Sequence, residues 1–148
     1  MAIAERSAQT TWRGSLAQGE GTLTSGSGAL GELPVTWASR TERSAGKTSP
    51  EELIAAAHAS CFSMALSHEL TQGGNAPEQL DVTAVVTLDR VNDAPTVTRS
   101  ALTVTGRVPG IDAAAFEAAA QGAGSGCPIS RLLAGGSAEI TVEATLAS

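Results

Sequence analysis

Alternating hydrophobic and polar positions dominate the first third of the chain. Residues 8–16 and 20–25 alternate over short runs, and residues 33–40 ("LPVTWASR") alternate more regularly. A period of two is typical of strands that bury one face. The pattern predicts three short strands, with a turn at residues 19–21 and a glycine-rich loop at residues 25–32.

A helix signal begins at Ser49. Ser49 is a favourable N-cap, Pro50 suits the first helical position, and Glu52 completes a capping box with Ser49. Residues 53–68 then contain no charged residue and are apolar on nearly every side. These features predict a central helix, covered on most sides, that ends near Gln72 where two glycines follow.

Alternation returns in the second half of the chain. Residues 78–90 and 96–110 are rich in Val and Thr, and the segment "SAEITVEATL" at residues 137–146 has the same character. They predict two long strands followed later by a final strand. The expected sheet is mostly antiparallel.

Two short helices are expected between the second long strand and the final strand. Asp112 should cap an Ala-rich helix that ends near Ala120, because "GAGSG" then interrupts it. "CPISRLL" should form one or two further helical turns with Pro128 at the first position. The element order predicts an α+β fold, and the length predicts one domain over residues 1–148.

Composition narrows the function classes. The net charge is −6, the pI is near 4.8, and only nine basic residues are spread along the chain, which disfavours nucleic acid. The first 12 residues have no apolar run typical of a signal peptide. The run at residues 53–68 falls short of the roughly 20 strongly apolar residues that a membrane span needs. We therefore expect neither a nucleic-acid nor a membrane partner, and a cytoplasmic location where thiols stay reduced.

The two cysteines are the main candidates for chemistry. Cys61 lies in "AHASCFSMAL", inside the predicted central helix, where a buried structural thiol is also common. Cys127 precedes Pro128 at a predicted helix start, where unpaired N–H groups favour the thiolate. The residues alone leave core packing and redox chemistry both open.

Two other roles involve the histidines. His58 and Cys61 share a helix face, and with His68 and Cys127 they could be imagined as zinc ligands. No CxxC pair exists and the histidines are ten residues apart, so we expect no metal and no cofactor. His58 acting as base to Cys61 resembles a thiol hydrolase dyad, although positions i and i+3 of one helix align poorly for proton transfer.

Several segments together resemble the OsmC/Ohr family, the osmotically inducible and organic hydroperoxide resistance proteins. They are "WRGSLAQGEGTL", "LPVTWASR", "TSPEELIAAAHASCFSMALS", "VPGIDAAAF" and "GCPISRLL". "VPGID" and an arginine late in the third predicted strand make the chain more similar to the OsmC branch. The resemblance implies antiparallel sheets around a long central helix, in an intertwined homodimer.

The resemblance also implies thiol-dependent reduction of organic hydroperoxides in oxidative or osmotic stress. By position, Cys61 matches the peroxidatic cysteine, Cys127 the resolving cysteine, Glu51 the motif's first glutamate, and Arg40 the arginine that supports the thiolate. Arg13 and Arg43 are the alternative arginines. Cys61 would form a sulfenic acid and then a disulfide with Cys127, which a dithiol, in this family a lipoylated protein, would reduce. A non-enzymatic stress or small-ligand binding protein and the Cys61/His58 hydrolase are the rival functions.

One arginine can supply the stabilisation that a Cys61 thiolate needs. Lowering a thiol pKa by about 2 requires about 3 kcal/mol of preferential thiolate stabilisation. One guanidinium at about 4 Å supplies about 4 kcal/mol at an effective dielectric near 20. Glu51 would hold the arginine in place, since its own charge repels a thiolate.

Helix geometry adds a constraint. Glu51 and Cys61 are ten residues apart, which is about 15 Å along a straight helix. They can share a site only if two copies of the helix meet, as in a twofold dimer. An apolar substrate pocket is expected to include Leu53, Phe62, Met64 and Ile129.

Overall fold

The computed structural model describes residues 1–136, so the predicted final strand lies outside the described residues. The chain divides into two compact units. The first holds residues 1–56 and 85–100, and the second holds residues 57–84 and the chain from residue 101 onward. The long helix and the long hairpin each contribute to both units. The single domain remains a prediction, and each unit is described by itself.

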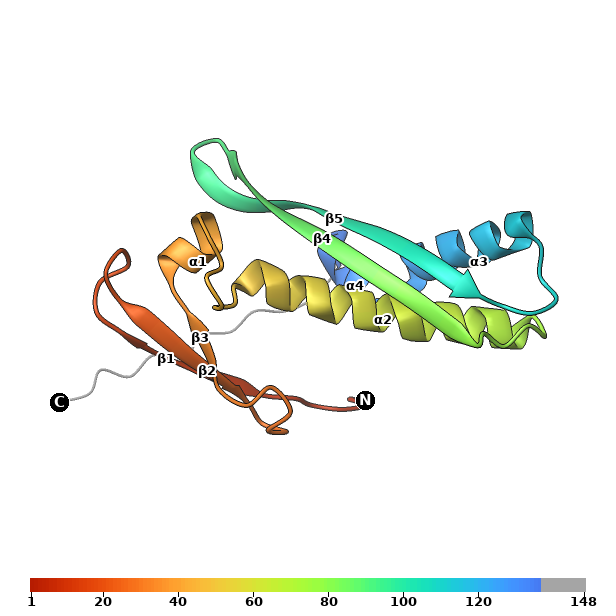
Figure 1. Ribbon diagram of the computed structural model, residues 1–148, viewed down its shortest axis with the longest axis horizontal. Helices are drawn as coiled ribbons and strands as arrows, with labels where there is room; N and C mark the ends of the chain where they lie inside the picture. The colour runs from red at the N-terminus through yellow and green to blue at the C-terminus, as the bar shows by residue number, and fades with distance from the viewer. Residues whose placement is uncertain (137–148) are drawn as a thin grey trace. The chain divides into compact units, whose positions relative to one another are not determined.

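The first unit contains a three-stranded antiparallel sheet in the order β1-β2-β3 (Figure 1). The strands are β1 (Ala8–Arg13), β2 (Glu20–Ser25) and β3 (Leu33–Val35). Leu23 on the central strand is buried, as the alternation predicts. The turn was predicted too late in the chain: it precedes Glu20, and the Gly19 N–H donates to the Ser15 carbonyl at 2.8 Å.

The prediction of a strand over residues 33–40 was wrong in its second half. The strand ends at Val35, and α1 (Trp37–Thr41) follows. Thr36 caps this helix: its hydroxyl accepts from the Ser39 N–H at 3.0 Å, while the Thr36 N–H donates to the Ser39 hydroxyl at 2.9 Å. This reciprocal capping box outweighs the alternating pattern. Arg40 therefore lies on a short helix instead of at a strand end.

The long helix α2 (Pro50–Gln72) has the predicted bounds. The Ser49 hydroxyl accepts from the Glu52 N–H at 3.2 Å, which forms one half of the predicted capping box. The other half is absent, because the Glu52 carboxylate instead accepts from the Thr48 hydroxyl at 2.8 Å. Gly74, at φ 87°, adopts the left-handed conformation that ends the helix.

Strands β4 (Gln79–Val91) and β5 (Ala94–Arg107) pair as a two-stranded sheet (Figure 1). Asn92 and Asp93 connect them, both with positive φ, in the manner of tight hairpin turns. Together with the long helix and the first sheet, the hairpin confirms the α+β class with antiparallel strands.

One hydrophobic core holds the second unit together. Its buried members come from α2 and from the region of α3 (Ala113–Gly126), with partly buried residues of β4 and β5 packed against them. The buried set is Phe62, Leu66, Leu70, Ala123 and Cys127. The core is built mainly from aliphatic side chains.

The third helix is longer than predicted. It continues through the glycine-rich segment to Gly126, and the Cys127 N–H still donates to the Ala123 carbonyl at 3.1 Å. Ala123 is buried, and a Cβ on Gly124 would lie 3.8 Å from the Phe62 ring. Packing of this small-residue segment in the core offsets the roughly 1 kcal/mol that each helical glycine costs. Helix α4 (Pro128–Leu133) follows with proline at its first turn, as predicted.

Candidate functional site: a thiol cluster and an arginine–glutamate pair

The two cysteines lie together in the second unit, and both are free thiols. Cys61 projects from α2 and is half-buried, whereas Cys127 joins α3 to α4 and is only 1% exposed. Cys127 is the N-cap of α4, and its sulfur accepts from the Ser130 N–H at 3.4 Å. The Ser130 hydroxyl lies 3.0 Å from the same sulfur.

The environment separates the acidities of the two thiols. Burial raises the pKa of Cys61 and the nearby Cys127 raises it further, against a smaller lowering by a hydrogen bond with the Ile129 backbone. Burial also acts to raise the pKa of Cys127. There it is outweighed by hydrogen bonds with the Ser130 side chain and backbone, the Cys61 thiol and the Ile129 backbone, so that the pKa of Cys127 is lowered. The lowered pKa predicted for a cysteine at this helix start is confirmed.

A buried histidine extends the cluster. His58 is 4% exposed, and its Nε2 lies 2.8 Å from the Ser130 hydroxyl. Burial lowers the pKa of His58, which favours the neutral imidazole. The hydrogen bond of Nε2 connects His58 to Cys127 through Ser130. The hydrolase alternative instead requires His58 to act as the base for Cys61. Ser130 was missed from the sequence, although its place three residues after the cap Cys127 is the spacing of a capping residue.

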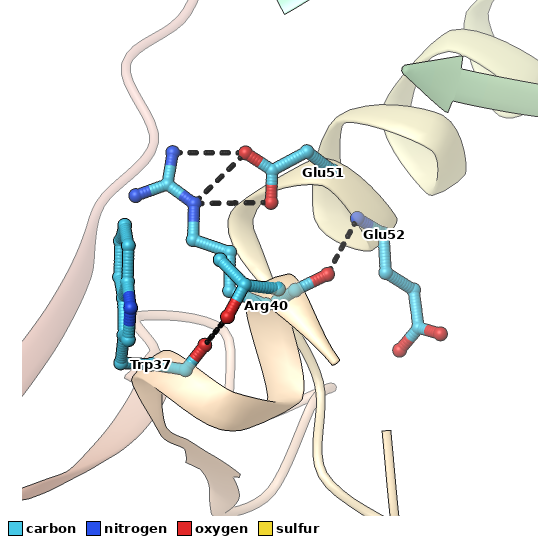
Figure 2. Close-up of polar contacts among 6 residues, drawn as sticks. Trp37, Arg40, Glu51 and Glu52 are labelled. Atoms are coloured by element: carbon cyan, nitrogen blue, oxygen red, sulfur yellow. Dashed lines mark hydrogen bonds and ion pairs between the residues drawn. The ribbon is translucent and has the colours of Figure 1, made fainter. Parts of the chain in front are cut away.

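The other two predicted site residues form an ion pair in the first unit (Figure 2). Arg40 Nη2 lies 2.8 Å from Glu51 Oε1, and Arg40 Nε donates to Oε1 and Oε2 at 3.0 and 3.2 Å. The guanidinium also lies over the Trp37 ring, 5.9 Å from its centroid. Glu51 is buried in the first turn of α2, where the helix dipole favours a negative charge. The predicted contact between these two side chains is present.

An apolar cavity of about 260 Å³ adjoins Arg40 within the first unit. Trp12, Leu16, Trp37 and Leu53 are among its lining residues. Its apolar walls with one cationic side chain could accommodate an organic group next to a polar one.

The predicted pocket residues are divided between different environments. Leu53 lines the cavity beside Arg40. Phe62 is buried in the core of the second unit, Ile129 packs against that core, and Met64 is 69% exposed. Leu53 thus belongs to the first unit and the other three residues to the second, so their grouping in one pocket stays a prediction.

Two further observations concern metal-ligating side chains and long apolar helices within residues 1–136. Within that range no group of three or more His, Cys, Asp or Glu residues could hold a metal ion. His68, unlike His58, is exposed. No helix in the described range has the length and apolar character needed to span a bilayer.

Comparisons with known proteins agree on one family. The family model described as "OsmC-like protein" matches residues 43–143. The chain is 45% identical to proteins named "Peroxiredoxin OsmC" from Escherichia coli (strain K12) and Shigella flexneri, over 95% of both chains in each case.

Solved structures share the fold. An organic hydroperoxide resistance protein OsmC from Legionella pneumophila is similar with a TM-score of 0.67 and 23% identity, covering 91% of this chain and 93% of that one. OhrB of Bacillus subtilis gives a TM-score of 0.65 and 24% identity, with 87% and 91% covered. The family model, the close relatives and the shared fold together establish that this chain belongs to the OsmC-like family.

Proposed function

We propose that the chain is a thiol-dependent peroxidase that reduces organic hydroperoxides to alcohols in stress defence. The observation that carries the proposal is the pairing of Cys61 with Cys127 in one cluster, with one thiol accessible and the other acidic. The relatives' name, Peroxiredoxin OsmC, supports the reaction class.

Cys61 is the proposed nucleophile because it is the thiol that a substrate can reach. It is half-buried, whereas Cys127 is 1% exposed, so access argues for Cys61 even though Cys127 has the lower pKa. The Cys61 thiolate attacks the distal oxygen of ROOH. A sulfur–oxygen bond forms, the O–O bond breaks, and the alkoxide leaves as ROH after taking a proton, which gives a Cys61 sulfenic acid.

Cys127 then resolves the sulfenic acid. Its thiolate attacks the Cys61 sulfur, the hydroxide leaves as water, and an intramolecular disulfide remains. Two electrons from an external dithiol return both cysteines to thiols by exchange. A lipoylated protein is the proposed class of donor, and the cytoplasm, where such reductants act, is the proposed location.

Activation of Cys61 requires a positive group that the thiol cluster itself does not provide. Burial and Cys127 raise the pKa of Cys61, so thiolate formation needs compensation. Arg40 is the proposed source, since a guanidinium at about 4 Å supplies about 4 kcal/mol at an effective dielectric near 20. Glu51 holds the planar guanidinium of Arg40 in one orientation.

The proposed site joins two copies of the chain. Glu51 lies about 15 Å from Cys61 along α2 by helix geometry, and Arg40 is bound to Glu51. We therefore assign the Arg40–Glu51 pair of one subunit to Cys61 of its partner in a twofold homodimer. Exposed small and apolar positions on α2, including Ala57, Ser60 and Met64, support a helix face that a second copy covers. The apolar cavity beside Arg40 suits the organic group of the substrate.

The proposal is tested by following consumption of cumene hydroperoxide in the presence of a dithiol. The wild type should turn over, Cys61→Ser should not, and Cys127→Ser should complete one oxidation and then stall. Full peroxidase activity in Cys61→Ser would refute the proposal. Absence of turnover in the wild type would favour the binding-protein alternative, and thioester cleavage that depends on both Cys61 and His58 would favour the hydrolase.

A further inference from the structure

A continuous hydrogen-bonded chain connects a buried histidine to the acidic thiol. His58 Nε2 lies 2.8 Å from Ser130 Oγ, which lies 3.0 Å from Cys127 Sγ. The three residues come from α2, α4 and the junction between α3 and α4. We propose that Ser130 and His58 form a proton relay that removes the thiol proton of Cys127 when this cysteine attacks the sulfenic acid of Cys61. This inference rests on the proposed peroxidase function.

The hydroxyl of Ser130 can serve both ends of the relay because it has one proton and two acceptor sites. When Cys127 is a thiol, its S–H donates to Ser130 Oγ and the Ser130 hydroxyl donates to His58 Nε2. When Cys127 is a thiolate, His58 Nε2–H donates to Ser130 Oγ and the hydroxyl donates to the sulfur. One concerted shift of two protons converts the first state into the second, without moving a heavy atom.

The resolution step then balances. The Cys127 thiol and the neutral His58 become a thiolate and an imidazolium, with Ser130 unchanged in total protons. The thiolate forms a bond to the Cys61 sulfur, and the sulfur–oxygen bond breaks. The leaving hydroxide takes up one proton and becomes water, and the His58 imidazolium releases one proton and is neutral again. The net change is a sulfenic acid and a thiol giving a disulfide and water.

Burial explains why an internal base is useful here. Cys127 is 1% exposed and His58 is 4% exposed, so bulk water has little access to the thiol proton. A neutral imidazole within two hydrogen bonds can accept it, and the resulting imidazolium is compensated by the nearby thiolate. Within residues 1–136, the titratable groups that this cluster brings together are His58 and the two thiols. The pKa of His58 is shifted by burial, and no charged group among the described residues contributes to that shift.

A purely structural role is the competing explanation, because Ser130 also occupies the third position of α4 beside its cap. Conservative variants separate the two. His58→Gln can keep a hydrogen bond to Ser130 but cannot hold a proton as a base. Ser130→Ala removes the hydroxyl and Ser130→Thr restores it. His68→Gln is the matched control, because it changes an exposed histidine of the same helix.

The experiment uses one equivalent of cumene hydroperoxide, rapid quenching and intact mass measurement, which separates sulfenic acid formation from disulfide formation. General base catalysis commonly contributes 10²–10⁴-fold, so we expect disulfide formation to slow by at least about tenfold in His58→Gln and Ser130→Ala. Sulfenic acid formation should be unchanged. Ser130→Thr should recover most of the rate that Ser130→Ala loses, and His68→Gln should behave as wild type. His58→Gln should lose the histidine-dependent part of the pH profile.

The results distinguish failure of the relay from failure of the proposed function. Disulfide formation within about twofold of wild type in both His58→Gln and Ser130→Ala, where a base should matter at least tenfold, would overturn the relay. Equal slowing of both phases would overturn it as well. Absence of any sulfenic acid or disulfide in the wild type would instead contradict the peroxidase function. If His58→Gln does not fold by circular dichroism, the Ser130→Ala and Ser130→Thr pair decides the question.

Discussion

Arg40 binds both carboxylate oxygens of Glu51, using Nε and Nη2 and leaving Nη1 outside the pair (Figure 2). The side chain of Glu51 is 9% exposed, whereas that of Arg40 is 32% exposed. The carboxylate is thus held inside the first unit while part of the guanidinium remains accessible. An arginine fixed in this way has a defined orientation and still has a donor for another group.

Arg40→Ala should slow the reaction of Cys61 with cumene hydroperoxide and move its pH dependence to higher pH. Without the guanidinium, only the hydrogen bond with the Ile129 backbone offsets the raising of the Cys61 pKa by burial and by Cys127, so less thiolate exists at neutral pH. Arg40→Lys should restore little of the lost rate, because an ammonium group cannot make the two-point contact with Glu51. Rapid-quench rates between pH 6 and about 10 measure the effect. Arg43→Ala is the control, and an unchanged pH profile in Arg40→Ala would exclude Arg40 as the activating group.

The same pair should also contribute to stability. Arg40→Ala leaves a buried carboxylate without this partner, which should lower the free energy of unfolding by about 1–3 kcal/mol. Adding Glu51→Gln to Arg40→Ala should recover part of the loss, because the uncompensated charge is removed. Urea unfolding measures both. A double variant less stable than Arg40→Ala would contradict this account of the pair.

Mixing two impaired variants, Cys61→Ser and Arg40→Ala, tests the site shared between subunits. A heterodimer of Cys61→Ser and Arg40→Ala contains one site with all groups intact and one site that lacks both. Such a heterodimer should recover about half of the wild-type activity, because one of its two symmetry-related sites is complete. If Arg40 and Cys61 act within one chain, mixing and subunit exchange should restore nothing beyond the activity of the separate variants.

Stability should fall in mildly acidic solution because of His58. Burial lowers the pKa of the folded-state imidazole below its ordinary value of about 6.5. The unfolded chain therefore binds more protons as pH falls through that value, so this contribution to stability is full above pH about 6.5 and is lost below it. Urea unfolding from pH 5 to about 8 should show this slope in wild type and in His68→Gln. The slope should be reduced in His58→Gln, and an unchanged slope there would contradict the assignment.

Local sequence signals predicted much of the fold. The Ser49 and Pro50 start and the following glycines placed α2 correctly, and period-two alternation found β4 and β5. The errors arose where another interaction outweighed the local signal on which the prediction was based. At residues 33–40 the Thr36 and Ser39 capping box prevailed over alternation, and at residues 122–126 core packing prevailed over glycine content.

The site was predictable only in its residue types. The cysteines were candidates from the residues alone, whereas their roles and the Arg40–Glu51 pair came from the family resemblance. These roles remain predictions. The contact between His58 and Ser130 joins residues 72 positions apart, so no local pattern could reveal it. The order of the thiol acidities likewise depends on burial and on the first turn of α4, which exist only in the folded chain.

The central claim is that Cys61 and Cys127 form a redox pair, and intact mass spectrometry after one equivalent of organic hydroperoxide tests it most directly. We expect a loss of two hydrogens, with peptide mapping that locates a single disulfide between Cys61 and Cys127 and with reversal by a dithiol. An unchanged mass, or oxygen addition that persists with both cysteines unpaired, would contradict the claim.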